Sequence, residues 1–176
     1  MNATHVHLLL NHFPVIGTLI GSGLILWGII KKQDQLKFAG AVVLSLMAII
    51  AIPVYLTGEP AEESVEDLAG VTESAIKLHE DAATIAIILM SITGLASLAA
   101  IFLTWQKKLS AKTAYLAAFI LSVICFAAMA RTGYFGGQIR HTEIAGAAIN
   151  GTQNETKAEK EQGAEKEEKE KDKDKD

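Results

Sequence analysis

Four long apolar stretches, separated by short polar loops, dominate the first 149 residues of the chain. Each is about 20 residues long or slightly longer, which is the length that a helix needs to cross roughly 30 Å of hydrocarbon. Up to residue 130 they contain no Asp, Glu, Lys or Arg, and they lack the polar face of a soluble bundle helix. Because backbone polar groups in lipid must be paired within the segment, each stretch should be helical. The pattern predicts an all-α, four-helix transmembrane bundle, with spans at about 8–30, 38–56, 82–105 and 114–135.

Residues 150–176 have the opposite composition. They are almost wholly Lys, Glu, Asp, Gln and small residues, and they end in EKEEKEKDKDKD. Such a segment buries too little apolar surface to offset the entropy of ordering. The predicted organisation is therefore a transmembrane domain at 1–149 and a disordered charged tail at 150–176. The formal net charge of −4 averages over these two unlike segments.

The charges of the loops predict the orientation of the bundle. The loops after the first and third spans are basic, whereas the loop at 57–80 is acidic and the stub at 1–7 has no Lys or Arg. The positive-inside rule then places both basic loops in the cytoplasm and both termini outside, in a bacterial inner membrane. The basic side chains are Lys31, Lys32 and Lys37 in the first loop, and Lys107, Lys108 and Lys112 in the second.

Three landmarks recur along the chain at similar spacings. Lys31-Lys32 is followed 76 positions later by Lys107-Lys108, Thr57-Gly58 is followed 75 positions later by Thr132-Gly133, and His7 precedes His79 by 72. These offsets predict two similar helical hairpins, related by an approximate twofold axis along the membrane normal. Such an axis would bring His5 or His7 opposite His79, near the outer surface.

All five histidines fall near the predicted outer face: His5, His7, His12, His79 and His141. His12 lies inside an apolar span, where a polar side chain needs a partner. That partner could be a neighbouring carbonyl, Asn11 or a cofactor. In a regular helix His7 and His12 would be about 140° apart, so both could serve one site only if Pro14 or a late helix start broke the helix.

His79 and His141 also allow two interpretations. Glu80 and Asp81 follow His79, and they could support a metal-bound imidazole or simply favour a helix start. His141 follows Gly136-Gly137 and Arg140, which could approach a cofactor or form an ordinary interfacial cap.

The opening HVHLLLNHFPVIG resembles the His-x-x-x-x-His-Phe-Pro start of a bacterial family of small predicted four-helix membrane proteins, a domain of unknown function. The resemblance covers residues 5 to about 145. It continues through Thr57-Gly58, His79 and the Gly136-Gly137 pair with His141. One departure is His7-Leu8, where the family usually has His-Pro.

The family is similar in plan to four-helix b-type cytochromes, which hold haem between histidines of different helices. The resemblance therefore implies haem b near the extracytoplasmic face, with ligands from His7, His12, His79 and His141. Arg131 and Arg140 would pair with the haem propionates.

Three hypotheses about function follow from these patterns. The first is a haem b protein that transfers electrons to an extracytoplasmic redox partner. The second is a Cu or Zn site held by the same histidines, His7, His12, His79 and His141. The third is a structural or interaction protein that presents the acidic loop at 57–80 and the charged tail to an extracytoplasmic partner. Bound haem requires these histidines to face the interior of the bundle, whereas the third hypothesis expects them around its outside.

The remaining features narrow the classes of function. The chain shows no hydrolase triad, phosphate-binding loop or nucleic-acid-binding surface, so whether it is an enzyme stays open. Its single cysteine, Cys125, lies in an apolar run and is expected to be a small buried side chain. The lipid bilayer is the one partner that composition demands, and a homo-oligomer stays open.

Overall fold

The computed structural model describes residues 2–68 and 71–140, and its elements of regular secondary structure within these ranges are α-helices. The helices are α1 (Ala3–Leu10), α2 (His12–Ile30), α3 (Asp34–Leu56), α4 (Gly58–Glu63), α5 (Glu73–Trp105) and α6 (Ala111–Arg140). Four segments are long and apolar enough to cross a membrane, namely Ala3–Ile30, Asp34–Leu56, Glu73–Trp105 and Ala111–Ile139. The predicted all-α transmembrane bundle is thus confirmed at this level. The predicted tail at 150–176 lies outside the described residues.

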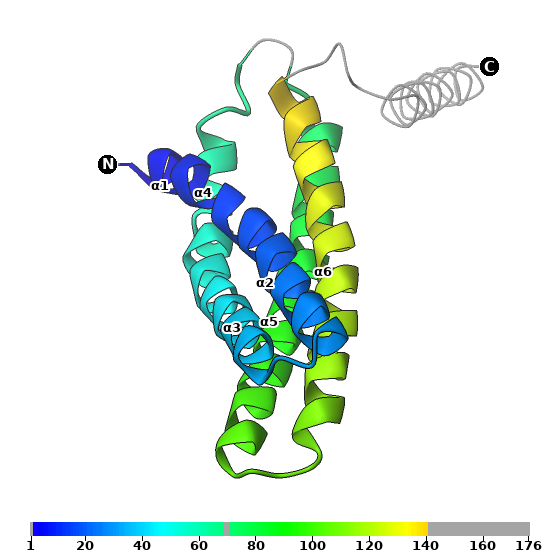
Figure 1. The fold of residues 1–176 in the computed structure, drawn as a ribbon. Coiled ribbons are helices and arrows are strands. Elements are labelled where there is room, and N and C mark those ends of the chain that lie inside the picture. The colour runs from blue at the N-terminus through cyan, green and yellow to red at the C-terminus, as the bar shows by residue number, and fades with distance from the viewer. Residues whose placement is uncertain (1, 69–70, 141–176) are drawn as a thin grey trace, which may run out of the picture.

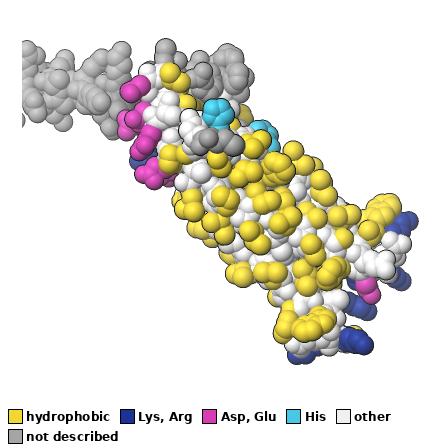
Figure 2. Space-filling view, turned by 90° about the vertical axis from the view of Figure 1, so that its left-hand side faces the viewer, with side chains coloured by type: hydrophobic (Ala, Val, Ile, Leu, Met, Phe, Trp, Pro, Cys, Tyr) yellow, Lys and Arg dark blue, Asp and Glu magenta, His cyan; other side chains and the backbone are white. Residues whose placement is uncertain are grey.

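The four long helices form a bundle in which each packs on two neighbours (Figure 1). Helix α2 packs on α3 and α6, and α5 packs on the same two helices, so α2 and α5 occupy diagonal corners. The middle of the outer surface is covered by exposed Leu, Ile, Val, Phe and Trp side chains (Figure 2). Such a surface suits a hydrocarbon solvent, as the composition predicts.

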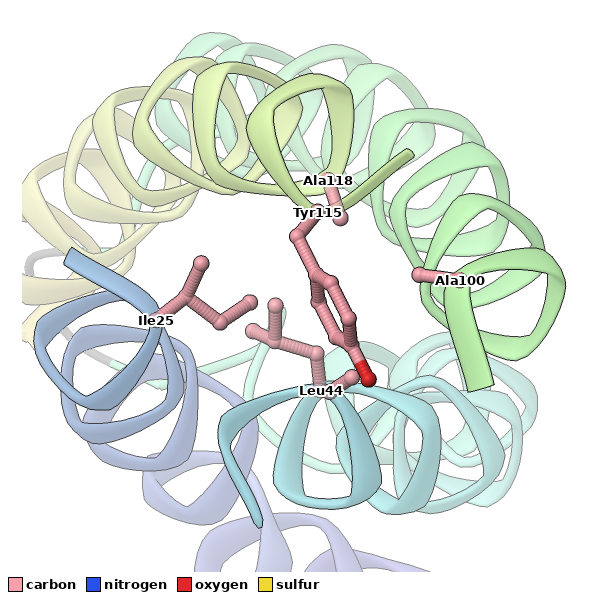
Figure 3. Close-up of a cluster of buried hydrophobic side chains, with 6 residues drawn as sticks. Ile25, Leu44, Ala100, Tyr115 and Ala118 are labelled. Carbon is pink, nitrogen blue, oxygen red and sulfur yellow. The ribbon is translucent and has the colours of Figure 1, made fainter. Parts of the chain in front are cut away.

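The core is built from layers to which several helices contribute. In one layer Ile25, Leu44, Ala100, Tyr115 and Ala118 meet, and the Tyr115 side chain reaches from α6 into the space between the four helices (Figure 3). The next layer, closer to the histidines, contains Met47, Ala51, Ala86, Met90, Cys125 and Met129. Cys125 is fully buried and free, as the sequence predicts.

Glycines let α2 and α3 approach closely. A Cβ atom on Gly40 would lie 2.6 Å from the Gly21 carbonyl oxygen and 2.9 Å from the Ile25 nitrogen, both backbone atoms. Backbone atoms cannot rotate away as a side chain can, so Gly40 fixes the distance between the two helices. The Gly17-x-x-x-Gly21 pattern lies on the same interface, where Met47 covers Gly17 and Leu44 covers Gly21.

The helix breaks at Asn11, between His7 and His12. Pro14 has no backbone N–H to offer the Leu10 carbonyl, so a continuous helix would lose that hydrogen bond. Helix α1 ends at Leu10, α2 begins at His12, and α1 leaves the line of α2 (Figure 1). The irregularity that the sequence suggested between the two histidines is therefore present.

The pattern of buried positions recurs between the two helix pairs. Six of the seven buried residues of α2 have a buried counterpart 72 positions later in α5: Pro14/Ala86, Thr18/Met90, Gly21/Thr93, Ser22/Gly94, Ile25/Ser97 and Gly28/Ala100. Five of the seven buried residues of α3 have one 78 positions later in α6: Lys37/Tyr115, Gly40/Ala118, Leu44/Ser122, Met47/Cys125 and Ala51/Met129. Lys32, in the turn between α2 and α3, and Lys107, in the turn between α5 and α6, each have a positive φ of 55°.

Candidate functional site

Two histidines make the same contact at the same end of the bundle. The Nδ1 atom of His7 lies 3.0 Å from the Val54 carbonyl oxygen, and Nδ1 of His79 lies 3.0 Å from the Thr132 carbonyl oxygen. A carbonyl oxygen can only accept a hydrogen bond, so Nδ1 carries the proton and donates in both rings. In a neutral imidazole this leaves Nε2 unprotonated, with its lone pair available to a ligand.

The acceptor of His7 is a carbonyl at the end of a helix. Val54 lies in the last turn of α3, where carbonyl groups lack an intrahelical donor. Its oxygen takes up the His7 imidazole and also lies 3.1 Å from the Thr57 hydroxyl. The contact between His7 and Val54 therefore forms because α3 ends there and leaves the Val54 carbonyl oxygen available.

The acceptor of His79 lies inside α6 instead. A carbonyl oxygen has two lone pairs, so the Thr132 oxygen can accept the imidazole proton without giving up an acceptor site that the helix uses. A glycine stands four positions after each acceptor, Gly58 after Val54 and Gly136 after Thr132. A Cβ atom on Gly136 would lie 3.0 Å from Cε1 of His79, whereas one on Gly58 would lie 3.8 Å from Cε1 of His7.

The two imidazoles come from different helix pairs. His7 lies on α1 and bonds α3, while His79 lies on α5 and bonds α6. Both side chains are half-buried, and they are close enough for a charge on His7 to act on His79. Figure 2 shows histidine side chains at the end of the molecule where acidic side chains gather, with lysines concentrated at the opposite end.

The other predicted site residues lie elsewhere or outside the described ranges. His12 is exposed at the start of α2, and His5 is exposed and bonds Oδ1 of Asn2 at 2.7 Å. Arg131 is exposed, with its guanidinium 5.1 Å from the centre of the Phe135 ring. His141 and the side chain of Arg140 lie outside what the structure describes. Of the predicted ligands, the structure thus places His7 and His79 in matching, internally bonded positions.

The donor set fits some ligands better than others. Within residues 2–68 and 71–140, no three side chains of His, Cys, Asp or Glu gather in a group that could hold a metal ion. A structural zinc ion takes four such ligands, whereas haem iron in a b-type cytochrome needs only two axial nitrogens. A buried Oδ1 atom of Asn11, which has no hydrogen-bond partner among the described residues, lies one helical turn beyond His7.

Sequence analysis had no way to find the two acceptor carbonyls. Any residue can supply a backbone oxygen, so Val54 and Thr132 carry no signal of their own. The glycines did give a signal, because Thr57-Gly58 and Gly136-Gly137 were both conspicuous. Their role, however, depends on which ring each one faces.

We expect Gly136→Ala to displace the His79 ring, because the new methyl group would lie 3.1 Å from Nδ1 and 3.0 Å from Cε1. Gly58→Ala is the matched control, since its methyl group would be in ordinary contact with His7. Proton NMR of the selectively labelled imidazoles should show a large change in the chemical shifts of His79 in Gly136→Ala and a small change in those of His7 in Gly58→Ala. Equal changes in both variants would contradict the geometry.

An ionisable carboxyl lies beside this end of the bundle, on α4. Burial, together with the neighbouring charges of Glu80 and Glu59, raises the pKa of the Glu62 carboxyl to about 7. The folded chain therefore favours the protonated form. The contribution of the protonated Glu62 carboxyl to stability is fully present below the ordinary pKa of 4.5 and is lost as the pH rises through about 7.

Melting in detergent should consequently occur at a lower temperature at pH 8 than at pH 5.5. In the Glu62→Gln variant the difference in melting temperature between pH 5.5 and pH 8 should shrink, because the amide is neutral at both pH values. Glu63→Gln, at the exposed neighbouring position, is the control, and it should show the same difference in melting temperature as the parent protein. Circular dichroism measures all three melting curves, and an unchanged difference in Glu62→Gln would refute the assignment.

Comparison with known families, curated proteins and solved structures finds no match for this chain.

Proposed function

We propose that this chain is a membrane haem b protein that transfers electrons at the extracytoplasmic face, with His7 and His79 as the axial ligands. One observation carries the proposal. Both imidazoles donate Nδ1–H to a carbonyl, which leaves Nε2 as the free nitrogen. A metal-bound histidine usually gives its other N–H to such an acceptor, which fixes the ring and raises its basicity.

We infer further that the bundle consists of two related hairpins, α2 with α3 and α5 with α6. The matching burial supports this, with an offset of 72 in the first helix of each hairpin and 78 in the second. The positive-φ lysines of the turns are 75 apart, midway between these values. The second hairpin is thus longer at its turn, and α5 and α6 extend beyond α2 and α3 at that end (Figure 1).

The duplication explains why two histidines have the same surroundings. His7 and His79 are 72 apart, and their acceptors Val54 and Thr132 are 78 apart, so both pairs follow the offsets of their helices. The glycines that face the two rings, Gly58 and Gly136, are also 78 apart. Two imidazoles with matching surroundings, one from each helix pair, suit a haem iron that takes two axial nitrogens from different helices.

The loop charges indicate the side of the membrane on which the histidine pair lies. Lysines at the end opposite the histidines support a cytoplasmic position for that end (Figure 2). Haem at the histidine end would then serve an extracytoplasmic redox partner. The resemblance to the bacterial four-helix membrane family is consistent with this plan and remains a prediction.

Haem titration tests the proposal. Purified protein in detergent should bind added haemin with a saturating Soret absorbance at one haem per chain. His5→Ala and His12→Ala are controls with exposed rings and should bind equally well. Binding without saturation, at the level of empty detergent micelles, would exclude a specific site.

A further inference from the structure

The centre of the bundle holds an unusual concentration of sulfur. The chain has four methionines and one cysteine, and three of the methionines share one core cluster with the cysteine. These residues are Met47, Met90, Met129 and Cys125, and none is more than 7% exposed. They lie beyond the histidines toward the middle of the apolar region, and their helices are α3, α5 and α6.

Two of the sulfur atoms are in contact, and the Thr18 hydroxyl links one of them to a third. The Sγ atom of Cys125 lies 3.6 Å from Sδ of Met90. The Thr18 hydroxyl oxygen of α2 lies 3.5 Å from Sδ of Met90 and 3.8 Å from Sδ of Met129. Two sulfurs bound to one ion at about 2.3 Å, with an angle near that of trigonal or tetrahedral coordination, would be separated by about 3.8–4.0 Å. The observed Cys125–Met90 separation of 3.6 Å is slightly shorter, so the two sulfurs would have to move apart by only about 0.2 Å to bind one ion.

The thioether sulfurs meet only weak donors: the Cys125 thiol donates to Sδ of Met90, and it would lose that proton on binding a metal ion. Thr18 has a single hydroxyl proton, and its shortest contact is the 2.6 Å hydrogen bond to the Pro14 carbonyl. That bond uses the proton, so the two Met–Thr18 contacts are close approaches of lone-pair atoms rather than full hydrogen bonds. The side chains of Thr18, Met90 and Cys125 are all fully buried.

We propose that Cys125, Met90 and Met129 form a buried site for a soft monovalent cation, Cu(I). Soft thiolate and thioether donors select Cu(I) over harder divalent ions. On binding, the cysteine thiol loses its proton to solvent and its sulfur bonds the ion. The +1 ion and the thiolate then sum to zero charge, while the two thioethers are neutral. A divalent ion would leave a net positive charge in a low-dielectric core, which is costly.

This site is separate from the histidine pair and does not rest on the proposed haem. It uses different side chains, in the deeper core layer of the bundle. The two proposals can therefore fail independently.

Silver(I) is a suitable redox-inert probe. The full-length protein, purified without haem in detergent, is incubated with excess silver nitrate in chloride-free buffer that contains imidazole as a competitor, and is then desalted. Elemental analysis should find one Ag(I) per chain, with ultraviolet absorbance from the metal–thiolate bond. Cys125→Ser should lower the affinity at least tenfold and abolish the absorbance, and Met90→Leu and Met129→Leu should each weaken binding.

The leucine variants conserve core volume, so they should keep the helical circular dichroism of the parent. The double variant His7→Ala, His79→Ala should retain the silver ion, which separates this site from the haem proposal. A parent protein that retains no Ag(I), or a Cys125→Ser variant that binds it as tightly, would overturn the assignment.

Discussion

Replacement of His79 by alanine is expected to abolish low-spin haem binding. The variant loses one of the two axial nitrogens, and the Thr132 carbonyl loses its imidazole donor. His7→Ala should have the same effect, because the two rings occupy equivalent positions and haem needs both for bis-histidine ligation. Visible absorbance should show loss of the sharp α band in each variant, with haem content reduced at least tenfold.

His12→Ala is the control on the same short region of chain. Its ring is exposed at the start of α2, so the haem spectrum should be unchanged. If His12→Ala removed the α band and His7→Ala did not, the ligand would be His12 and the Val54 contact would have a purely structural role. The helix break at Asn11 makes this a meaningful comparison, because it separates the two rings onto different helices.

Gly40→Leu is expected to cause the largest loss of stability of any single change on the α2–α3 interface. A Cβ atom alone would lie 2.6 Å from the Gly21 carbonyl oxygen and 2.7 Å from Cγ1 of Ile25. Overpacking of a close-packed core costs about 1–3 kcal/mol, and the upper end applies where a backbone atom is the obstacle. Unfolding in sodium dodecyl sulfate, followed by circular dichroism, measures the loss.

Gly23→Ala is the matched control, since nothing lies within 4 Å of a Cβ atom at that position. Its free energy of unfolding should stay close to that of the parent. Equal destabilisation by the two changes would show that α2 and α3 do not pack as described.

The helices themselves were predictable because membrane crossing imposes a strong constraint on sequence. The predicted spans end at residues 30, 56 and 105, and the helices end at the same residues, Ile30, Leu56 and Trp105. Their beginnings were less clear: α5 begins at Glu73 rather than near residue 82, because a helix can continue past the apolar stretch into water. Apolar length marks the lipid-facing part of a helix rather than the whole of it.

The candidate site was only partly accessible to sequence reasoning. His7 and His79 were recognised, and the suspected break near Pro14 is present, but His12 was grouped with them and lies exposed. The sequence could not tell which ring points inward, because that depends on the direction that the chain takes after Asn11. The carbonyl partners were also beyond reach, since backbone atoms have no identity in the sequence.

The landmarks of the repeat show a similar limit. Thr57-Gly58 was aligned with Thr132-Gly133 at an offset of 75, whereas the residue that faces the second histidine as Gly58 faces the first is Gly136. The offset of the dipeptides lies midway between the two offsets of the burial pattern, which recurs after 72 positions from α2 to α5 and after 78 positions from α3 to α6. A single fixed spacing could not represent two different offsets.

The most direct test of the haem proposal is a dithionite-reduced minus oxidised absorbance spectrum of the purified protein from haem-supplemented cells. We expect a Soret maximum with sharp α and β bands, because two imidazole ligands give a low-spin iron. A flat difference spectrum, from protein that is folded by circular dichroism, would contradict it.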